Sequence, residues 1–196
     1  MKKTWIVLAV IAAVVLIIFI WFKNSYNNLV VMEENVKGKW SQVETQYQRR
    51  ADLIPNLVST VKGYADFEKS TLTQVVEARA NATKVTISPE NLDAKSIKEF
   101  QEAQNRVSSA LGRLLAVAEN YPNLKANQNF LDLQSQLEGT ENRITVARND
   151  YNNEVKVYNQ TIRKFPQMIF AGMFGFEKAA YFEADKGSEK APEVKF

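Results

Sequence analysis

Apolar side chains recur every three or four residues over the stretch from Val36 to Ala82, and this pattern constrains the fold more than any other feature of the chain. Such spacing places the side chains along one face of a helix. The first part of this apolar face consists of Val36, Trp40, Val43, Tyr47, Ile54, Leu57, Val61 and Tyr64. Arg50 is the one charged residue on it.

The positions before and after Pro55 keep the same helical phase. We therefore expect one long helix that bends at the proline, and no loop there. The pattern continues through Leu72 and Val75 to about Ala82, so the predicted helix also runs across Gly63. The other helices of the protein are expected to pack on this one.

The segment from Trp5 to Phe22 contains no charged residue and is long enough, at about 1.5 Å per residue, to cross a hydrocarbon layer of about 30 Å. Aromatic rings stand at both ends of the segment and lysines flank them, as is typical of a membrane-spanning helix. The alternative is a cleaved signal peptide. Trp21, Phe22 and Lys23 offer no pair of small residues for cleavage, so we predict a retained anchor in contact with the bilayer.

The distribution of lysines gives a prediction of orientation. Lys2, Lys3 and the amino terminus outweigh Lys23 on the other side of the apolar segment. By the positive-inside tendency, the N-terminus faces the cytoplasm and the large domain lies outside it.

The rest of the chain predicts an all-α fold, an N-terminal transmembrane helix followed by a long antiparallel bundle of three to four helices packed like a coiled coil. A second helix is expected from Pro89 to about Tyr121 and a third from Leu124 to Phe165, each with its own apolar face. The predicted domains are a membrane anchor over 1–23, the bundle over 24–183 and a flexible tail over 184–196.

After Phe165 and Pro166 comes a short apolar segment that ends near Phe176. Because apolar residues occur on more than one of its faces, something must cover it. It could close the open end of the bundle, or it could dock against the membrane surface or a protein partner.

Composition argues against an enzyme. The chain has no cysteine and no histidine, so it lacks thiolate chemistry, the commonest general base and the commonest transition-metal ligands. We expect no catalytic residue, no bound metal and no cofactor, and no glycine-rich phosphate loop is present. The formal net charge of +3 is spread along the helices, which does not indicate a nucleic-acid partner.

Four polar residues near Pro55 are the candidate interaction site. Arg49, Asp52 and Asn56 form one polar stripe along the helix, whereas Arg50 belongs to the apolar face. A buried guanidinium needs partners.

Arg50 has two interpretations. It forms an interhelical ion pair that fixes helix register, with Glu138, Glu141 or Asp150 as candidate partners, or it binds an anionic group. The second site would lie where Pro55 leaves the Ala51 carbonyl without its helical donor.

Several motifs resemble those of the LemA family and together cover nearly the whole chain. They are Trp40-Ser41, the run Arg49-Arg50-x-Asp52-Leu53-Ile54-Pro55-Asn56-Leu57-Val58, Val61-Lys62-Gly63-Tyr64-Ala65, Glu68, Ala78-Arg79, Leu133-x-x-x-Leu137-x-x-x-Glu141-Asn142-x-Ile144-x-x-Ala147-Arg148-x-x-Tyr151-Asn152 and Arg163-x-Phe165-Pro166. The resemblance implies a bacterial single-pass protein of the cytoplasmic membrane, with a helical bundle and no established catalytic activity. It also implies a role in membrane organisation and an association with a membrane metalloprotease.

Two functions follow from these patterns. The first is a non-enzymatic membrane-anchored scaffold or adaptor that binds a protein partner, or further copies of itself, or organises membranes. The alternative is a ligand-binding or sensor bundle that signals at the membrane through Arg50 and the Pro55 region. A carboxylate-dependent hydrolase would need a motif that the sequence lacks.

Overall fold

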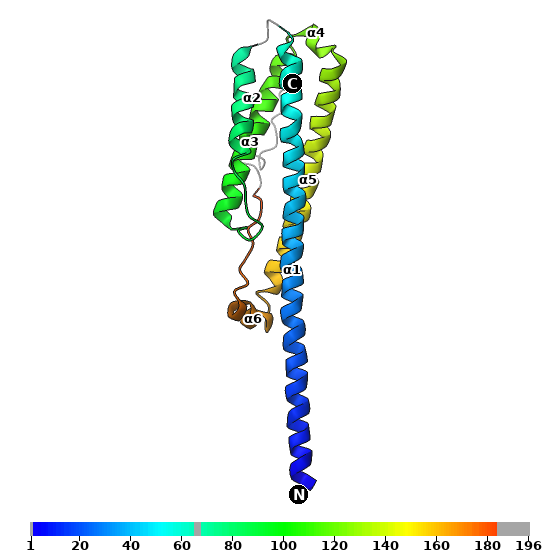
Figure 1. The fold of residues 1–196 in the computed structure, drawn as a ribbon, viewed down its shortest axis with the longest axis vertical. Helices are drawn as coiled ribbons and strands as arrows, with labels where there is room; N and C mark the ends of the chain where they lie inside the picture. The colour runs from blue at the N-terminus through cyan, green and yellow to red at the C-terminus, as the bar shows by residue number, and fades with distance from the viewer. Residues whose placement is uncertain (1, 65–67, 184–196) are drawn as a thin grey trace, which may run out of the picture.

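The computed structural model of the chain describes residues 2–64 and 68–183, and every regular element within them is a helix, as predicted (Figure 1). The helices are α1 (Lys2–Lys62), α2 (Lys69–Ala82), α3 (Ala94–Ala118), α4 (Pro122–Lys125), α5 (Gln128–Thr161) and α6 (Gln167–Phe174). The predicted flexible tail lies outside the described residues.

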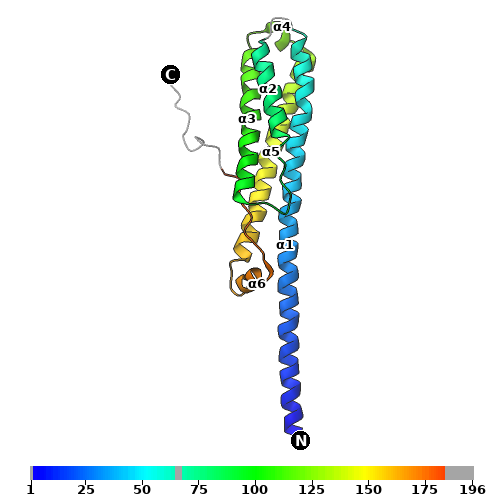
Figure 2. The same ribbon diagram turned by 60° about the vertical axis from the view of Figure 1, so that its left-hand side comes forward.

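Helix α1 is a single rod of 61 residues, about 90 Å long at ~1.5 Å per residue. Its N-terminal part stands clear of the rest of the molecule in both side views (Figures 1 and 2). Its C-terminal part is the central helix of the bundle, and the residues between the two parts, from Lys23 to Asn35, are also helical. Pro55 lies inside α1 and does not end it, which confirms the prediction of one helix through this position.

The prediction that the same helix runs on to Ala82 is wrong. Helix α1 ends at Lys62, and α2 folds back beside its C-terminal part (Figure 1). Gly63 follows the last helical residue, and the Tyr64 hydroxyl donates to the Asn123 carbonyl at 3.3 Å, which ties the turn to α4. The apolar phase is retained on both sides of the turn because both helices face the same core, so periodicity alone does not reveal the reversal.

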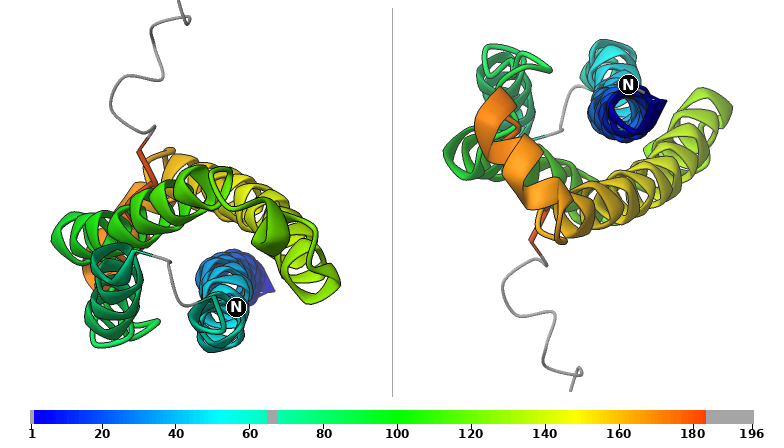
Figure 3. Two further views of the ribbon diagram at one scale, coloured as in Figure 1. Left: turned by 90° about the horizontal axis from the view of Figure 1, so that it is seen from above. Right: turned by 90° about the horizontal axis from the view of Figure 1, so that it is seen from below.

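The bundle consists of α1, α2, α3 and α5, each antiparallel to the next along the chain (Figures 1 and 2). Helices α1 and α5 pack along each other, as do α2 and α3. Seen from above, α1 lies inside the arc formed by the other helices (Figure 3). The predicted antiparallel bundle is therefore confirmed, with four helices.

Helix α3 begins later than predicted. Pro89 lies in a turn in which the Asn91 amide donates to the Ser88 carbonyl at 2.8 Å, a position that suits proline. The helix starts after Asp93, whose carboxylate accepts from the Lys95 and Ser96 amides at 2.8 and 2.9 Å. An aspartate N-cap thus sets the boundary, and it does so more strongly than the proline.

The third long helix is also shorter than predicted, because α4 and a turn precede it and it ends at Thr161. Asn127 is its N-cap, with the side-chain oxygen accepting from the Phe130 amide at 3.1 Å. After α5, Pro166 precedes α6, as predicted. Gly175 ends α6 with φ of 75°, a left-handed conformation that glycine adopts without steric cost.

An extended segment from Glu177 to Glu183, here called the strap, follows α6 and runs back along the bundle (Figure 1). Its Phe182 is buried, and the amide of Ala180 donates to the Leu92 carbonyl at 2.9 Å.

The buried apolar residues form two clusters along the bundle. The proximal cluster, nearer the free part of α1, is rich in aromatic residues and includes Trp40, Tyr47, Phe100, Tyr151 and Phe182. The distal cluster is mainly aliphatic and is built from the ends of α1, α3 and the start of α5 together with α2. The candidate site lies between these two clusters.

Candidate functional site

Arg50 is at the centre of the site and is 2% exposed. Its Nη1 donates to Ser108 Oγ at 2.7 Å and to Glu141 Oε2 at 2.9 Å. Its Nη2 donates to the carbonyl oxygen and the side-chain oxygen of Gln104, at 3.1 and 2.8 Å. The guanidinium also lies 5.0 Å from the centre of the Tyr47 ring. One cation therefore joins α1, α3 and α5.

The predicted ion pair is confirmed, with Glu141 as the partner among the three candidates. The Glu141 side chain is about half exposed, so this pair is buried on the arginine side alone. Removing the guanidinium from water is costly, and the hydrogen bonds that both of its Nη atoms donate offset this cost.

The Ala51 carbonyl, one residue further along α1, has the partner that Pro55 does not supply. Proline has no N–H to donate to the residue four positions before it. Arg79 of α2 donates from Nε to the Ala51 carbonyl at 2.7 Å. The proline thus creates an acceptor on α1 that positions α2 against it.

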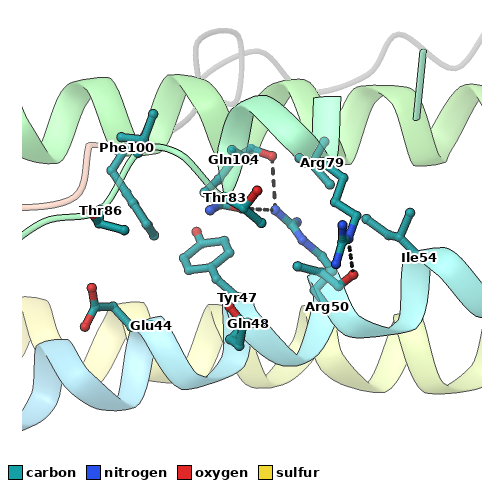
Figure 4. A pocket seen from close by; sticks show the side chains of 14 residues that line it. Glu44, Tyr47, Gln48, Arg50, Ile54, Arg79, Thr83, Thr86, Phe100 and Gln104 are labelled. Carbon is teal, nitrogen blue, oxygen red and sulfur yellow. Dashed lines mark hydrogen bonds between the residues drawn. The ribbon is translucent and has the colours of Figure 1, made fainter. Parts of the chain in front are cut away.

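A cavity of about 90 Å³ lies beside these two arginines, between α1, α2, α3 and the segment that follows α2. Figure 4 shows Arg50 and Arg79 at one end of it, Tyr47 in the middle and Glu44 and Thr86 at the other end. A water molecule takes up about 30 Å³ in the liquid, so the cavity has room for a few waters or one small polar group. It is too small for a cofactor.

Glu44 is the acidic side chain that lines this cavity. Burial raises the pKa of its carboxyl group above the ordinary value, and the indole N–H of Trp40 acts in the opposite direction. The carboxyl group is therefore somewhat more easily protonated than one in water.

The other three predicted site residues do not join Arg50. Arg49, Asp52 and Asn56 are exposed on α1, outside the cavity. Asp52 accepts from Gln48 Nε2 at 2.8 Å, a bond within the same helix. The structure separates the candidate set into one buried cation and one solvent-facing stripe.

The arrangement of these residues indicates a structural role more than a catalytic one. Within the part of the chain that the structure describes, no group of three or more acidic side chains could hold a metal ion. The cavity presents two arginines and one carboxylate but no nucleophile paired with a base. A polar layer that fixes the register of the helices explains these residues, and binding of a small polar group in the cavity is the chemistry they allow.

Sequence reasoning did not identify Gln104, Ser108 and Arg79 as partners. Arg79 belongs to the motifs quoted above, but nothing in its spacing indicates that it reaches α1. Gln104 and Ser108 lie four residues apart on α3, on the side of the helix that bears Phe100 and Val107. Polar residues on the apolar side of a helix indicate that a polar or charged partner lies on the facing helix, and this signal was present in the sequence.

The strap was also missed, although amide side chains bond both backbone groups of three of its residues. Asn159 pairs with both backbone groups of Ala179 at 2.8 and 3.1 Å, and Asn152 with both of Phe182 at 3.1 and 2.9 Å. Gln101 does the same with Glu183, at 2.8 and 3.3 Å. These bonds fix an extended chain that has no helix or sheet partner of its own.

The free part of α1 has the properties of a membrane span. Every large apolar side chain from Trp5 to Trp21 is exposed, and none belongs to either core cluster. Among the described residues, α1 is the one helix long and apolar enough to cross a membrane by length and composition. A row of exposed aliphatic side chains of this length would be strongly unfavourable in water.

Known proteins match this chain over most of its length. The sequence pattern of the LemA family matches residues 39–196. Magnetosome protein MamQ 2 of Paramagnetospirillum magneticum is 30% identical over 175 residues, which cover 81% of this chain and 64% of the relative. Magnetosome protein MamQ of Magnetospirillum gryphiswaldense is 28% identical, with 80% and 64% covered. Protein LemA of Metamycoplasma hominis is 22% identical, with 82% and 69% covered. The chain thus spans less than two thirds of the length of the magnetosome relatives.

Proposed function

The chain belongs to the LemA family, and from this premise we propose that it is a membrane-anchored, non-enzymatic helical scaffold that holds a protein-binding surface at a fixed place above the bilayer. The relatives named as magnetosome proteins support the membrane association in this proposal. The association with a membrane metalloprotease and the position of the bundle outside the cytoplasm stay predictions.

The continuity of α1 is the observation that carries this proposal. The apolar segment and the central helix of the bundle are one helix of 61 residues, without a loop between them. The bundle therefore has little freedom to rotate or tilt relative to the segment proposed to span the bilayer. Such a rod suits a protein that positions partners better than one that must open and close around a substrate.

The polar stripe on α1 is the surface we propose for partner binding. Arg49, Asp52 and Asn56 are exposed, and none of their side chains is needed for the polar layer around Arg50. They lie on the central helix, whose position relative to the anchor is fixed. A partner that binds here would be held at a defined distance from the membrane.

Photo-crosslinking in living cells tests the proposal. A photoreactive amino acid replaces Arg49, Asp52 or Asn56 in the full chain, expressed at its native level, and Glu99 on α3 is the exposed control position. We expect discrete protein adducts from the stripe positions and not from Glu99. Adducts that are equal at all positions, or a chain recovered without any adduct, would contradict the proposal.

The sensor alternative has one specific observation in its favour, the cavity between Arg50, Arg79 and Glu44. A small polar ligand there would contact α1, α2 and α3 together. Replacement of both Arg50 and Gln104 by leucine separates the two functions, because a purely structural polar layer can be replaced by apolar residues at little cost. If this double variant keeps both stability and cellular function, the sensor function is excluded.

A reporter fused after Phe196 tests the orientation. We expect activity from a reporter that works outside the cytoplasm and none from one that needs the cytoplasm. The reverse result would place the bundle inside the cell and would replace the set of partners to be considered.

A further inference from the structure

Helix α6 has an apolar face that no part of the described protein covers. Its sequence from Gln167 to Phe174 contains no charged residue. The outward residues are Met168, Ile169, Gly172 and Met173, with exposed fractions of 54% for Met168, 52% for Ile169 and 64% for Met173. A side chain added at Gly172 would meet nothing within 4 Å. This face needs an apolar environment outside the bundle.

The opposite face of α6 fixes its place on α1. The Phe170 ring lies 5.2 Å from the Trp21 ring and 4.9 Å from the Phe22 ring. The Phe174 ring lies 5.7 Å from Phe22 and 4.9 Å from Tyr26. Edge-to-face contacts of this kind define the relative position of two helices well. Helix α6 is thus held at the end of the apolar segment.

That position coincides with the expected edge of the bilayer. The 18 residues from Trp5 to Phe22 of α1 would span about 27 Å at ~1.5 Å per residue, close to the thickness of a hydrocarbon core of about 30 Å. Tryptophan and tyrosine rings prefer the boundary between hydrocarbon and headgroups. The aromatic rings that hold α6 therefore belong to the boundary region.

The direction of α6 also fits the bilayer surface. In the view from below, α1 is seen end-on while α6 lies lengthwise across the picture (Figure 3). A span that follows the bilayer normal would place α6 in the plane of the interface. Arg163 and Lys164, both exposed, precede α6 and can reach lipid phosphates.

We propose that the outward face of α6 inserts into the headgroup boundary of the same bilayer that α1 crosses, so that the protein holds the membrane by one spanning and one interfacial helix. The partner of this face is lipid. This inference rests on the proposed anchoring of α1 and adds a second attachment site to it. Two attachments at an angle prevent the rod from tilting, which a single span does not.

The natural absence of cysteine allows a direct test. Single-cysteine variants M173C in α6, L16C in the span and V146C on α5 are labelled with a nitroxide in the full chain. The chains are placed in vesicles of phosphatidylethanolamine and phosphatidylglycerol. Val146 is 60% exposed and lies in the bundle, so V146C is the matched control for an exposed apolar position. Spin relaxation by oxygen, which is concentrated in lipid, is compared with relaxation by a water-soluble nickel chelate.

We expect oxygen to dominate at M173C and L16C and nickel to dominate at V146C. A label at M173C as accessible to nickel as the one at V146C would overturn the inference, with the anchor intact if L16C stays in lipid. Protection of M173C from both reagents would also overturn it, because a protein or a second copy of the chain would then cover α6. Nickel access at L16C would instead refute the anchor.

Discussion

The two halves of the bundle close their cores in different ways. In the distal half, α2 lies beside α1 and α3 and supplies Leu72, Val75 and Ala82 to the aliphatic cluster. Helix α2 has 14 residues and α3 has 25, so α2 is too short to reach the proximal half. There, the connection that bears Ile87 and Leu92 covers the aromatic cluster together with the strap. In the proximal half, extended segments thus take the place that α2 has in the distal half.

This difference concerns the element that completes each core. In the distal half that element is α2, which is the sequence neighbour of both helices it packs against, α1 and α3. The proximal half depends on bonds between the strap and residues 20, 30 and 82 positions away, namely Asn159, Asn152 and Gln101. We infer that the strap docks late in folding, because the helices that carry its partners, α3 and α5, must be in place before these bonds can form.

The largest expected effect is that of Trp40→Ala in the proximal half. Trp40 is fully buried, and its ring lies 5.1 Å from Phe100 and 5.8 Å from Phe182 of the strap. We expect a loss of about 3–5 kcal/mol in the free energy of unfolding. Because Phe182 loses its stacking partner, amide hydrogen exchange in the strap should also become faster. Denaturant titration and hydrogen exchange measure the two effects.

Leu114→Ala is the matched control in the distal half, where Leu114 is fully buried. It should cost about 2–5 kcal/mol without faster exchange in the strap. Equal exchange rates in the strap of both variants would show that the halves do not differ as described.

Arg50 lies where the two halves meet, and its replacement tests whether the polar layer separates them. Arg50→Ala leaves Gln104, Ser108 and Glu141 without their donor and creates a cavity, so it should cost about 3–5 kcal/mol. Replacement of both Arg50 and Gln104 by leucine should be nearly neutral, since an apolar layer would then join the two clusters. Denaturation midpoints of both variants decide this. A double variant as unstable as Arg50→Ala would contradict the interpretation that an apolar layer can replace the polar layer around Arg50.

Asn152→Ala tests the strap without change to the aromatic core. It removes the partner of both backbone groups of Phe182, bonded at 3.1 and 2.9 Å, and should cost about 1–3 kcal/mol. Exchange should become faster at Phe182 and Glu183 and stay unchanged in the distal half. Asn142→Ala, on the exposed side of α5, is the control and should have no measurable effect. If both variants behave alike, the amide pairs do not hold the strap.

The sequence predicted the helices and their contacts well where periodicity carried the information. The apolar face on α1 identified Trp40, Tyr47 and Ile54 as core residues, and all three are buried. The interruption by Arg50 predicted a buried ion pair, and one of three candidate partners forms it. Here, local spacing and the cost of burying a charge were sufficient.

The remaining features depend on information that spacing does not contain. The reversal after Gly63 keeps the apolar phase, so the same pattern describes one helix or a helical hairpin. The strap has no periodicity, and the amides of Asn152, Asn159 and Gln101 resemble ordinary polar surface positions in sequence. Their partners lie on a distant segment, and no short-range rule connects the two.

The hydrogen bond from Arg79 to the Ala51 carbonyl, which Pro55 leaves without a helical donor, lies on the distal side of the polar layer. Its loss should have a smaller effect on stability. Arg79→Ala leaves the Ala51 carbonyl without its donor and should cost about 1–2 kcal/mol. Pro55→Ala restores a backbone N–H at the position that can donate to this carbonyl. Arg79→Ala should therefore cost less in the Pro55→Ala background than in the natural chain, as a double-mutant cycle measures. Additive effects would show that Arg79 does not compensate for the proline.

Glu44→Gln is the smallest change and concerns the proximal wall of the cavity. Burial raises the pKa of Glu44, so the folded chain holds this proton more tightly than the unfolded chain does. The stability that protonated Glu44 adds to the folded chain is fully present below the pKa that Glu44 has in the unfolded chain. It is lost as pH rises through the higher pKa that Glu44 has in the folded chain. Glutamine cannot ionise, so the variant should melt at a slightly higher temperature than the natural chain at neutral pH and at the same temperature in acid. Melting curves across this range provide the measurement. A stabilisation that persists unchanged in acid would mean that packing of the amide, and not loss of the charge, is responsible.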